Sequence, residues 1–188
     1  MREVELKAVV DDLAERRAMV EAAGGTLSFE GKISDRRYDS ASRELSARDE
    51  VLRIRRYQNR ESTKMFLDWK GPTEMRDVYK IREEITTGVE DSESLERIFE
   101  NLGLTLVGQI DRQIAQYQLR GATIRFETYP RMDTLVEVEG EPPAIEEVIE
   151  VLGLPRGTFT NERLAAFIER FERRTGVRAV ISDRGVTQ

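Results

Sequence analysis

The sequence predicts an α+β fold in which about eight mostly antiparallel strands are accompanied by four helices. Three observations lead to this fold class. Strand-like segments alternate apolar and charged side chains, the connections between them are short, and four segments carry apolar residues at helical spacing. A chain of 188 residues is long enough to bury a sizeable core in one domain. Eight strands can close into a barrel, although this pattern alone does not establish closure.

The first half of the chain predicts one helix and five strands. The helix begins at Asp11 or Asp12, whose carboxylates can cap it, and it ends near Ala23 before a Gly-Gly pair. The polar segment 40–49 is predicted to be a loop. The first strand is expected to begin at residue 2. The other four are expected at 26–39, 51–58, 63–70 and 78–86.

The second half predicts three helices and three strands. One helix follows Asp91, a second carries the apolar positions of 145–152, and a third is capped near Thr160. Each repeats apolar residues at i, i+3, i+4 and i+7, so we expect its apolar stripe to pack on the outside of the sheet. The strands are expected at 104–118, 122–129 and 134–139.

The composition excludes several classes of site. The chain has no cysteine and no histidine, so thiol nucleophiles, zinc-thiolate sites and the commonest general base are absent. Any metal must bind oxygen ligands, which favours magnesium, manganese or calcium. The net charge of -6 argues against a nonspecific nucleic-acid or membrane binder. With short apolar runs and a first strand that leaves no room for a signal peptide, we expect a cytoplasmic protein.

Long charged side chains share one face of one strand after another. In residues 3–7, Glu3, Glu5 and Lys7 lie on one face of the strand, and Val4 and Leu6 lie on the other. The first and last strands are mainly acidic, whereas the strands at 51–58 and 63–70 are basic. The charged positions of the later strands are Arg53 and Arg55, Lys70, Arg82 and Glu84, Arg112, Arg125 and Glu127, and Glu137 and Glu139.

Two interpretations of these charged faces remain open. In the first, the charges are solvated and pair across neighbouring strands. In the second, the helices cover the apolar faces from outside, and the charged faces line a tunnel with carboxylates on one wall and Arg and Lys on the other. Arginine and lysine bind phosphate oxygens, and carboxylates hold Mg²⁺. The ligand of such a tunnel would be a triphosphate bridged by one or two metal ions.

The same residues resemble the motifs of the CYTH family, also called the triphosphate tunnel metalloenzymes. Glu3, Glu5 and Lys7 match the Glu-x-Glu-x-Lys motif near the amino terminus. The resemblance covers a single domain at 1–175 and leaves 176–188 as a C-terminal tail. Further motifs match in the family's order: Tyr38-Asp39, Leu52-Arg53-Ile54-Arg55, Lys70-Gly71-Pro72, Arg82-Glu83-Glu84, Thr128-Tyr129-Pro130 and Val136-Glu137-Val138-Glu139-Gly140.

The resemblance implies a closed eight-stranded antiparallel β-barrel, with helices packed outside, that binds a triphosphate together with Mg²⁺ or Mn²⁺. It implies that Glu84 and Glu127 are the candidate catalytic residues, as further ligands or as groups that position the attacking oxygen. Homodimers occur among relatives, so a second copy is a candidate partner. The implied metal ligands are Glu3, Glu5, Glu137 and Glu139. The implied phosphate-binding residues are Lys7, Arg53, Arg55, Lys70, Arg82 and Arg112.

The chain departs from the family pattern at two places. Glu127 stands where many relatives carry aspartate, and its extra methylene would shift a bound metal. Many relatives carry a lysine before the arginine that matches Arg112, but this chain has Gln109, Ile110 and Asp111 there. The second departure implies that one phosphate contact is missing, so the substrate stays open.

The leading functional hypothesis is a metal-dependent phosphohydrolase that cleaves ATP, thiamine triphosphate or tripolyphosphate. Without histidine, a carboxylate or a metal-bound hydroxide must carry the proton. The alternative within the enzymes is a class IV adenylate cyclase, which converts ATP to cyclic AMP and pyrophosphate. An alternative of another class is a noncatalytic module that binds nucleotides or polyphosphate. We expect no nucleic-acid partner and no membrane partner.

Overall fold

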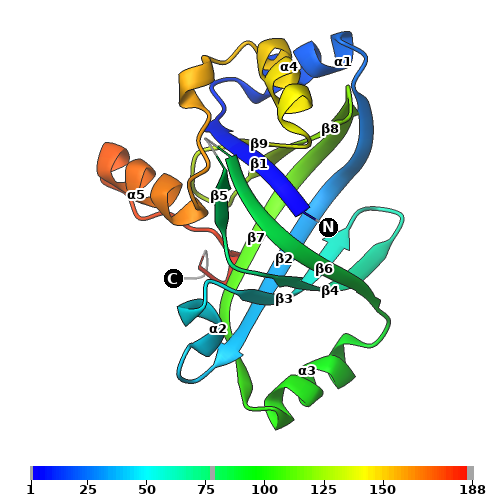
Figure 1. The fold of residues 1–188 in the computed structure, drawn as a ribbon, viewed down its shortest axis with the longest axis vertical. Coiled ribbons are helices and arrows are strands. Elements are labelled where there is room, and N and C mark those ends of the chain that lie inside the picture. Colours follow the sequence, from blue (N-terminus) through cyan, green and yellow to red (C-terminus); the bar gives the residue numbers. More distant parts are fainter. Residues whose placement is uncertain (1, 77–78, 186–188) are drawn as a thin grey trace.

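A computed structural model describes residues 2–76 and 79–185, without the side chains of residues 2, 3, 76, 80 and 185 (Figure 1). Its strands are β1 (Arg2–Val9), β2 (Thr26–Ser40), β3 (Val51–Gln58), β4 (Thr63–Lys70), β5 (Glu74–Arg76), β6 (Tyr79–Val89), β7 (Leu104–Leu119), β8 (Ala122–Thr128) and β9 (Leu135–Glu139). Its α-helices are α1 (Leu13–Ala22), α2 (Glu44–Ala47), α3 (Ser92–Asn101), α4 (Pro142–Leu152) and α5 (Leu164–Thr175), and its 3₁₀ helices are η1 (Arg156–Thr158) and η2 (Asp183–Gly185).

Eight of the described strands close into an antiparallel barrel. They pair in the order β1-β9-β8-β7-β2-β3-β4-β6, and β6 pairs back with β1 through Val4 and Ile81. Among the described residues, strand β5 pairs only with β6 and adds a short ninth strand beside the barrel. This architecture confirms the predicted α+β fold with a closed eight-stranded antiparallel barrel and helices outside it.

Two predictions about local structure were wrong, and one strand was not predicted. The segment predicted as a loop at 40–49 contains α2, because the Asp39 carboxylate accepts hydrogen bonds from the backbone N–H groups of Leu45 and Ser46. Strand β5 was not predicted, since it depends on pairing with β6 rather than on its own pattern. Thr160 does not cap α5; its backbone forms a bridge with Lys7, and the helix begins after Arg163.

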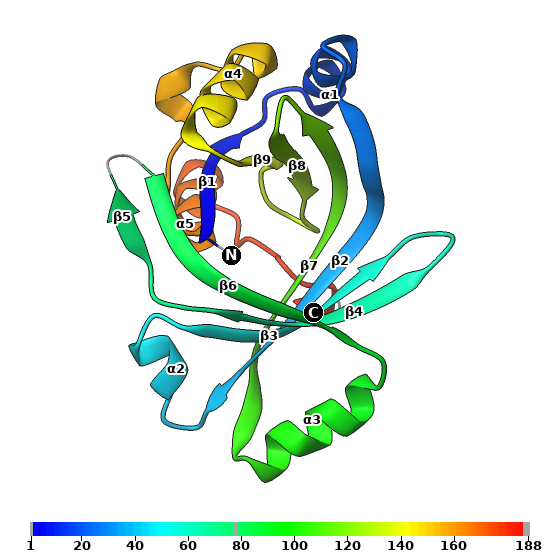
Figure 2. The same cartoon turned by 45° about the vertical axis from the view of Figure 1, so that its right-hand side comes forward.

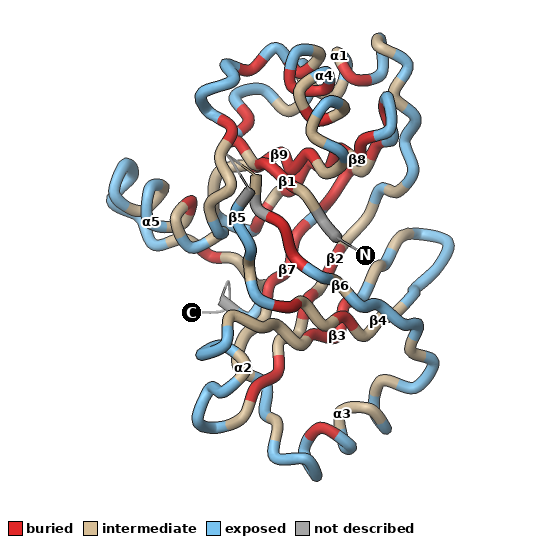
Figure 3. Tube along the Cα trace, viewed as in Figure 1, coloured by how far each residue is buried: buried red, intermediate tan, exposed pale blue. Residues whose placement is uncertain are grey.

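The outer face of the barrel carries the apolar core. Figures 1 and 2 show α1 and α4 side by side at one end of the molecule and α3 at the opposite end. Under α1 and α4, the buried cluster joins β1, β7, β8 and β9, whose buried residues are coloured in Figure 3. Around α3, Phe99 packs with Tyr38 and Ile54. The longest described helix, α5, has 12 residues, and none of the described helices is long and apolar enough to cross a membrane.

Helix α5 and the segment that follows it lie against β7 near Ile110 and Asp111. Phe167 of α5 packs with Ile110, Tyr129 and Leu135. After the helix, the backbone of Val180 pairs with Arg131, and the carbonyl of Ile181 accepts a hydrogen bond from the N–H group of Asp111. These contacts place the beginning of α5 over one end of the barrel.

Candidate functional site in the barrel lumen

The lumen of the barrel contains two cavities that lie end to end. The first, of about 250 Å³, ends at the first residues of α5, and the second, of about 560 Å³, extends toward the β3–β4 hairpin. Arg55 and Arg125 line both cavities. We call the first the cation-rich chamber. It is lined by Glu5, Lys7, Asp35, Arg37, Arg53, Arg55, Lys70, Arg82, Arg112, Arg125, Glu127, Tyr129 and Glu137, together with Asp49, Arg163 and neighbouring apolar residues.

We call the second cavity the aromatic chamber. Its rings are Phe29, Tyr57 and Phe66, on β2, β3 and β4. Its charged residues are Arg55, Glu61, Lys64, Asp68, Glu84, Arg125 and Glu139, and its neutral polar residues are Ser28, Asn59, Ser62, Thr86 and Gln116.

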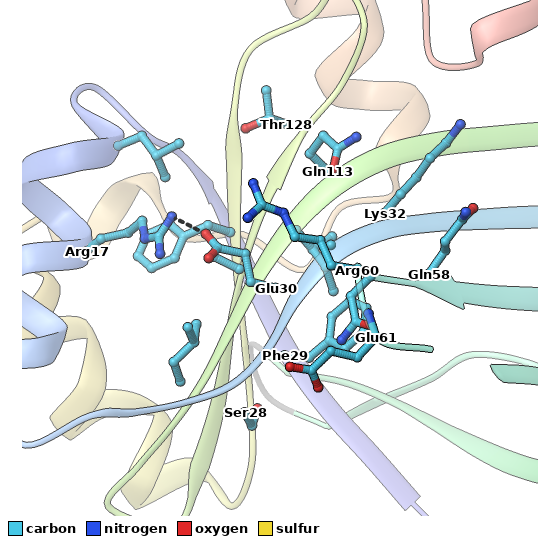
Figure 4. A pocket seen from close by; sticks show the side chains of 17 residues that line it. Arg17, Ser28, Phe29, Glu30, Lys32, Gln58, Arg60, Glu61, Gln113 and Thr128 are labelled. Carbon is cyan, nitrogen blue, oxygen red and sulfur yellow. Dashed lines mark hydrogen bonds and ion pairs between the residues drawn. The ribbon is translucent and has the colours of Figure 1, made fainter. Parts of the chain in front are cut away.

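A third and larger hollow, of about 950 Å³, lies on the outside of the barrel (Figure 4). Gln113 and Thr128 line it, and they alternate with Arg112 and Glu127, which line the lumen. Arg17 from α1 crosses to Glu30 with an N–O distance of 2.7 Å, and Lys32 forms an ion pair with Asp183. Ser28, Phe29, Asn59 and Glu61 line both this hollow and the second cavity, so the two meet beside the β3–β4 hairpin. The candidate site is the lumen, because all six predicted phosphate-binding residues line it and none of them lines the hollow.

Lys7 forms two ion pairs with carboxylates of the predicted metal site. Its Nζ lies 2.9 Å from Oε1 of Glu5 and 2.7 Å from Oε2 of Glu137. Burial acts to lower the pKa of Lys7, but Glu137 and Glu5 outweigh it and raise the pKa above the usual value. The other oxygen of Glu137 accepts a hydrogen bond of 2.6 Å from Arg125. Lys7 and Arg125 together hold the pKa of Glu137 well below its usual value against the effect of burial.

Asp35 is the centre of the arginine cluster. Only 1% of its surface is exposed, and it accepts two hydrogen bonds from Arg55, of 2.7 and 2.9 Å. Arg112 donates a third of 3.1 Å, and Arg53 approaches to 3.5 Å. Burial alone would raise the pKa of Asp35, but the three guanidinium groups hold it well below its usual value. Asp35 therefore fixes three phosphate-binding candidates that come from two different strands.

Both carboxylate oxygens of Glu127 accept hydrogen bonds from neighbouring side chains. One carboxylate oxygen accepts a hydrogen bond of 2.8 Å from Arg112, and the other accepts one of 2.7 Å from the hydroxyl of Tyr129. Burial, followed by the charge of Glu127, raises the pKa of Tyr129 well above its usual value. In this arrangement Glu127 orients Arg112.

The remaining predicted cations also have defined contacts. Arg53 donates a hydrogen bond of 2.9 Å to Asp68, and Lys70 lies 2.9 Å from Glu84. Arg82 donates to the carbonyl oxygens of Gly71, at 2.7 Å, and Asp49. The lumen thus brings together all six predicted phosphate-binding residues.

Arg37 differs from the other described arginines of the lumen. It lines the cation-rich chamber, but its Nε is buried without a hydrogen-bond partner. Burial and the nearby guanidinium of Arg53 lower the pKa of Arg37 to about 10. A partly buried cation among other cations is unfavourable unless an anion binds beside it.

The balance of charge differs between the two chambers of the lumen. Among the described residues that line the cation-rich chamber, nine are arginine or lysine and five are carboxylates. In the aromatic chamber, four carboxylates face three cations, two of which are shared with the first chamber. Asp35 and Asp68 lie among the arginines because each buried guanidinium needs a compensating carboxylate.

The predicted metal ligands lie on two neighbouring strands. In the β1–β9 ladder, Glu5 is directly opposite Glu139, and Lys7 is opposite Glu137. Glu3 lies on β1, but its side chain is outside the described residues. Among the described side chains, no group of three carboxylates is arranged as a metal site. The donor set still fits a hard divalent cation, because it offers only oxygen and places like charges directly opposite each other.

Sequence reasoning missed several residues that the lumen contains, among them Asp35, Arg37, Asp49, Asp68 and Arg163. A signal was present for the first two, which are two residues apart in a segment predicted as a strand and so share a face. Nothing in the local sequence of Arg163 indicates that it would reach Asp49, at 2.7 Å across the chamber entrance.

The strand motifs, the closed barrel and the charged lumen agree with comparisons to known proteins. A protein of Methanocaldococcus jannaschii, named as a candidate adenylate cyclase, is 28% identical over 152 residues, which cover 81% of this chain and 84% of that protein. Among solved structures, a candidate adenylate cyclase from Vibrio parahaemolyticus superposes with a TM-score of 0.75 at 18% identity, covering 89% of this chain and 97% of that chain.

Two further structures share the fold. The PH1819 protein from Pyrococcus horikoshii has a TM-score of 0.74 at 23% identity, over 89% of this chain and 98% of that chain. A candidate adenylyl cyclase from Hippeastrum, described as having a dominant triphosphatase activity, has a TM-score of 0.63 at 16% identity, over 89% and 96%. The CYTH domain family matches residues 1–154. The chain therefore belongs to the CYTH domain family, as the motifs on its strands predicted.

Proposed function

We propose that this protein binds a triphosphate in the lumen together with a divalent cation and hydrolyses it. The observation that carries the proposal is the excess of positive charge in the cation-rich chamber, where nine cationic side chains face five carboxylates among the described lining residues. A triphosphate carries several negative charges in a short chain. It would compensate this excess and give the Nε of Arg37 a hydrogen-bond partner.

Phosphate oxygens suit this chamber better than a carboxylate ligand of similar charge. Arginine presents a planar fork of N–H donors that matches phosphate geometry, and the predicted set includes Arg53, Arg55 and Arg112. Asp35 holds these three guanidinium groups in fixed positions, so little side-chain freedom would be lost on binding. The first residues of α5 also line the chamber, and the positive end of a helix dipole favours an anion.

A divalent cation fits the acidic wall formed by β1 and β9. Glu3, Glu5, Glu137 and Glu139 would hold it, as the family resemblance implies. Mg²⁺ or Mn²⁺ would neutralise phosphate charge and lower the pKa of a bound water. Lys7, which pairs with Glu5 and Glu137, would then turn toward a phosphate oxygen.

The chain's own side chains divide the remaining work. Lys7, Lys70 and Arg82 would bind phosphate oxygens beside the three arginines that Asp35 holds, and Arg37 would add a contact that the sequence did not predict. Glu84, which lies 2.9 Å from Lys70, and Glu127 remain the two candidates to accept a proton or position the attacking oxygen, as the family resemblance implies. Glu127 would position Arg112.

The second candidate function is an adenylate cyclase. It is favoured by the 28% identity to a Methanocaldococcus jannaschii protein named for that activity. In this reaction a ribose hydroxyl, in place of water, attacks the phosphate chain, and pyrophosphate leaves. The same cation-rich chamber would hold the phosphates in both reactions, so the identity of the product separates them.

The experiment that tests the proposal is ³¹P NMR of the protein incubated with ATP, thiamine triphosphate and tripolyphosphate, in Mg²⁺ and separately in Mn²⁺. We expect orthophosphate. If ATP instead yields pyrophosphate and cyclic AMP, the protein is an adenylate cyclase and not a hydrolase. If a triphosphate binds and no product forms, both enzymatic functions are wrong and the protein is a noncatalytic receptor.

The metal ligands are tested in the same assay. Glu5→Gln and Glu139→Gln are each expected to abolish metal-dependent turnover while the fold persists, because each removes one ligand charge. Glu83→Gln is the matched control, since Glu83 is exposed on β6 and alternates with the lumen residues Arg82 and Glu84. Full activity in both ligand variants would remove the metal assignment.

A further inference from the structure

Three aromatic rings line the wide end of the lumen and contact one another. Phe29 and Tyr57 pack edge to face, with ring centres 5.3 Å apart and an angle of 89° between the rings. Tyr57 and Phe66 pack in the same way at 5.8 Å and 90°. The rings come from β2, β3 and β4, which are adjacent in the barrel. They form one continuous aromatic surface.

This surface is not part of the hydrophobic core. None of the three rings belongs to the buried clusters under α1 and α4, around α3 or beneath α5 among the described residues. All three are only partly buried, and they face a cavity of about 560 Å³. Partly buried rings that line a cavity of this size are typical of a site for an organic ligand.

The aromatic surface begins where the phosphate-binding residues end. Arg55 lines both chambers, and its guanidinium lies 5.8 Å from the centre of the Tyr57 ring. The same guanidinium is held by Asp35 in the cation-rich chamber. A ligand whose phosphates contact Arg55 would therefore place its next group against Tyr57.

The charge of the aromatic chamber is less favourable for phosphate groups than that of the cation-rich chamber. Four carboxylates, Glu61, Asp68, Glu84 and Glu139, face three cations, and two of these cations are shared with the other chamber. An inorganic tripolyphosphate would leave this space filled with water against three rings. A planar heterocycle would stack on the rings, and Ser62, Thr86 and Gln116 lie in the same chamber to meet its polar edge.

We propose that the aromatic chamber binds a planar organic group, so that the substrate is a nucleoside triphosphate or another heterocyclic triphosphate and not inorganic tripolyphosphate. The inference rests on the proposed function, because it requires the phosphates to lie in the cation-rich chamber. The rings of Phe29, Tyr57 and Phe66 then decide which triphosphate is accepted, and the arginines do not.

The test is calorimetric binding of ATP, thiamine triphosphate and tripolyphosphate, in Mg²⁺, to the full chain and to the variants Tyr57→Leu and Phe66→Leu. The wild type should bind at least one heterocyclic triphosphate about tenfold or more tightly than tripolyphosphate, as expected for base–aromatic stacking. Each variant should lose about tenfold for that ligand and keep its affinity for tripolyphosphate. Phe171→Leu is the matched control, because Phe171 is a partly buried ring on α5 that does not line either chamber.

The outcomes separate this proposal from the proposed function. If tripolyphosphate binds as tightly as both heterocyclic ligands, or if the variants weaken all three ligands equally, the aromatic chamber does not select the substrate and the proposed function stands. If no triphosphate binds, both proposals fail. In the wild type, ATP or thiamine triphosphate should also shift the NMR resonances of the three rings when tripolyphosphate does not. This second measurement decides the question even where a variant does not fold.

Discussion

Strand β8 presents two kinds of buried side chain on its two faces. Ile124 and Phe126 point outward and join the core cluster with Val148 of α4, whereas Arg125 and Glu127 point into the lumen. All four are 9% exposed or less, so burial alone does not distinguish the two faces. The distinction lies in the free energy of burial, which is favourable for the outer pair and unfavourable for the inner pair unless their charges are compensated.

The comparison indicates what each face is for. The outer face gains stability from apolar burial and needs no ligand. The inner face buries charges that ion pairs compensate, and several of these ion pairs involve Asp35, whose three arginines come from β3 and β7. A protein that required only stability would fill this lumen with apolar side chains, as replacements of buried ion pairs indicate. Under the proposed function, the charges are retained because they bind the triphosphate.

The largest expected effect comes from removing the charge of Asp35. Asp35→Asn leaves the guanidinium groups of Arg53, Arg55 and Arg112 without their shared carboxylate, so we expect a loss of about 3–5 kcal/mol in the free energy of unfolding. Urea denaturation measures it. The outer-face control Ile124→Val should lose only about 1 kcal/mol. If Asp35→Asn loses no more than the control, the inner face does not depend on charge compensation.

A second change separates stability from binding at a single residue. Arg37→Gln removes a partly buried cation that has no partner at Nε, so the ligand-free protein should become more stable by roughly 1 kcal/mol. The sign follows from its pKa of about 10, which lies below the usual arginine value. The folded chain holds this proton less tightly than the unfolded chain, so the charged form opposes folding at neutral pH.

The same variant should weaken tripolyphosphate binding about tenfold, because one charge-assisted contact is lost. Thermal denaturation without ligand and calorimetry with tripolyphosphate give the two values. Arg36→Gln is the matched control, since Arg36 is the adjacent residue of β2 and pairs with Glu96 of α3 outside the lumen. We expect only the Arg37 variant to gain stability without ligand and to lose affinity for tripolyphosphate. A destabilised variant with unchanged affinity would contradict the assignment of Arg37 to the ligand.

The outer and inner faces could be separated from the sequence because alternation is a local property. The positions of Arg53 and Arg55, or of Glu137 and Glu139, fix which side of their strands is charged. Closure of the barrel could not be predicted from this local pattern. It requires β6 to pair with β1, and Val4 and Ile81 are neighbours only after the sheet has curved through all its other strands.

The ion-pair partners of the lumen charges could not be predicted either, because they also depend on which strands pair. Asp35 meets Arg55 across the β2–β3 pair, and it meets Arg112 because β7 pairs on the other side of β2. The register of both neighbours has to be known before these contacts can be drawn. That Arg37 lacks a partner at Nε is a further consequence of this register. The metal ligands, whose roles came from the family resemblance, stay predictions.

The smallest expected effect concerns Asp39, which lies on the same strand as Asp35 but serves the outer structure. Its carboxylate accepts hydrogen bonds of 3.0 and 2.9 Å from the N–H groups of Leu45 and Ser46, and one of 2.6 Å from the Ser46 hydroxyl. Burial opposes ionisation, but these hydrogen bonds lower the pKa of Asp39 to about 2. A lowered carboxyl pKa adds stability that is complete above about pH 4 and disappears as the pH falls through 2.

Asp39→Ala should therefore lose about 1 kcal/mol at pH 7, as expected when the side chain that caps a helix is removed. Between pH 4 and pH 2 its free energy of unfolding should fall less steeply than that of the wild type, because this proton is no longer linked to folding. Urea denaturation at several pH values measures both. Added tripolyphosphate should leave the difference between Asp39→Ala and wild type unchanged, whereas it should reduce the loss in Asp35→Asn by giving the arginines an anion. If tripolyphosphate also reduces the loss in Asp39→Ala, the loop that contains α2 belongs to the ligand site, and the two aspartates of β2 do not divide between the inner and outer structure.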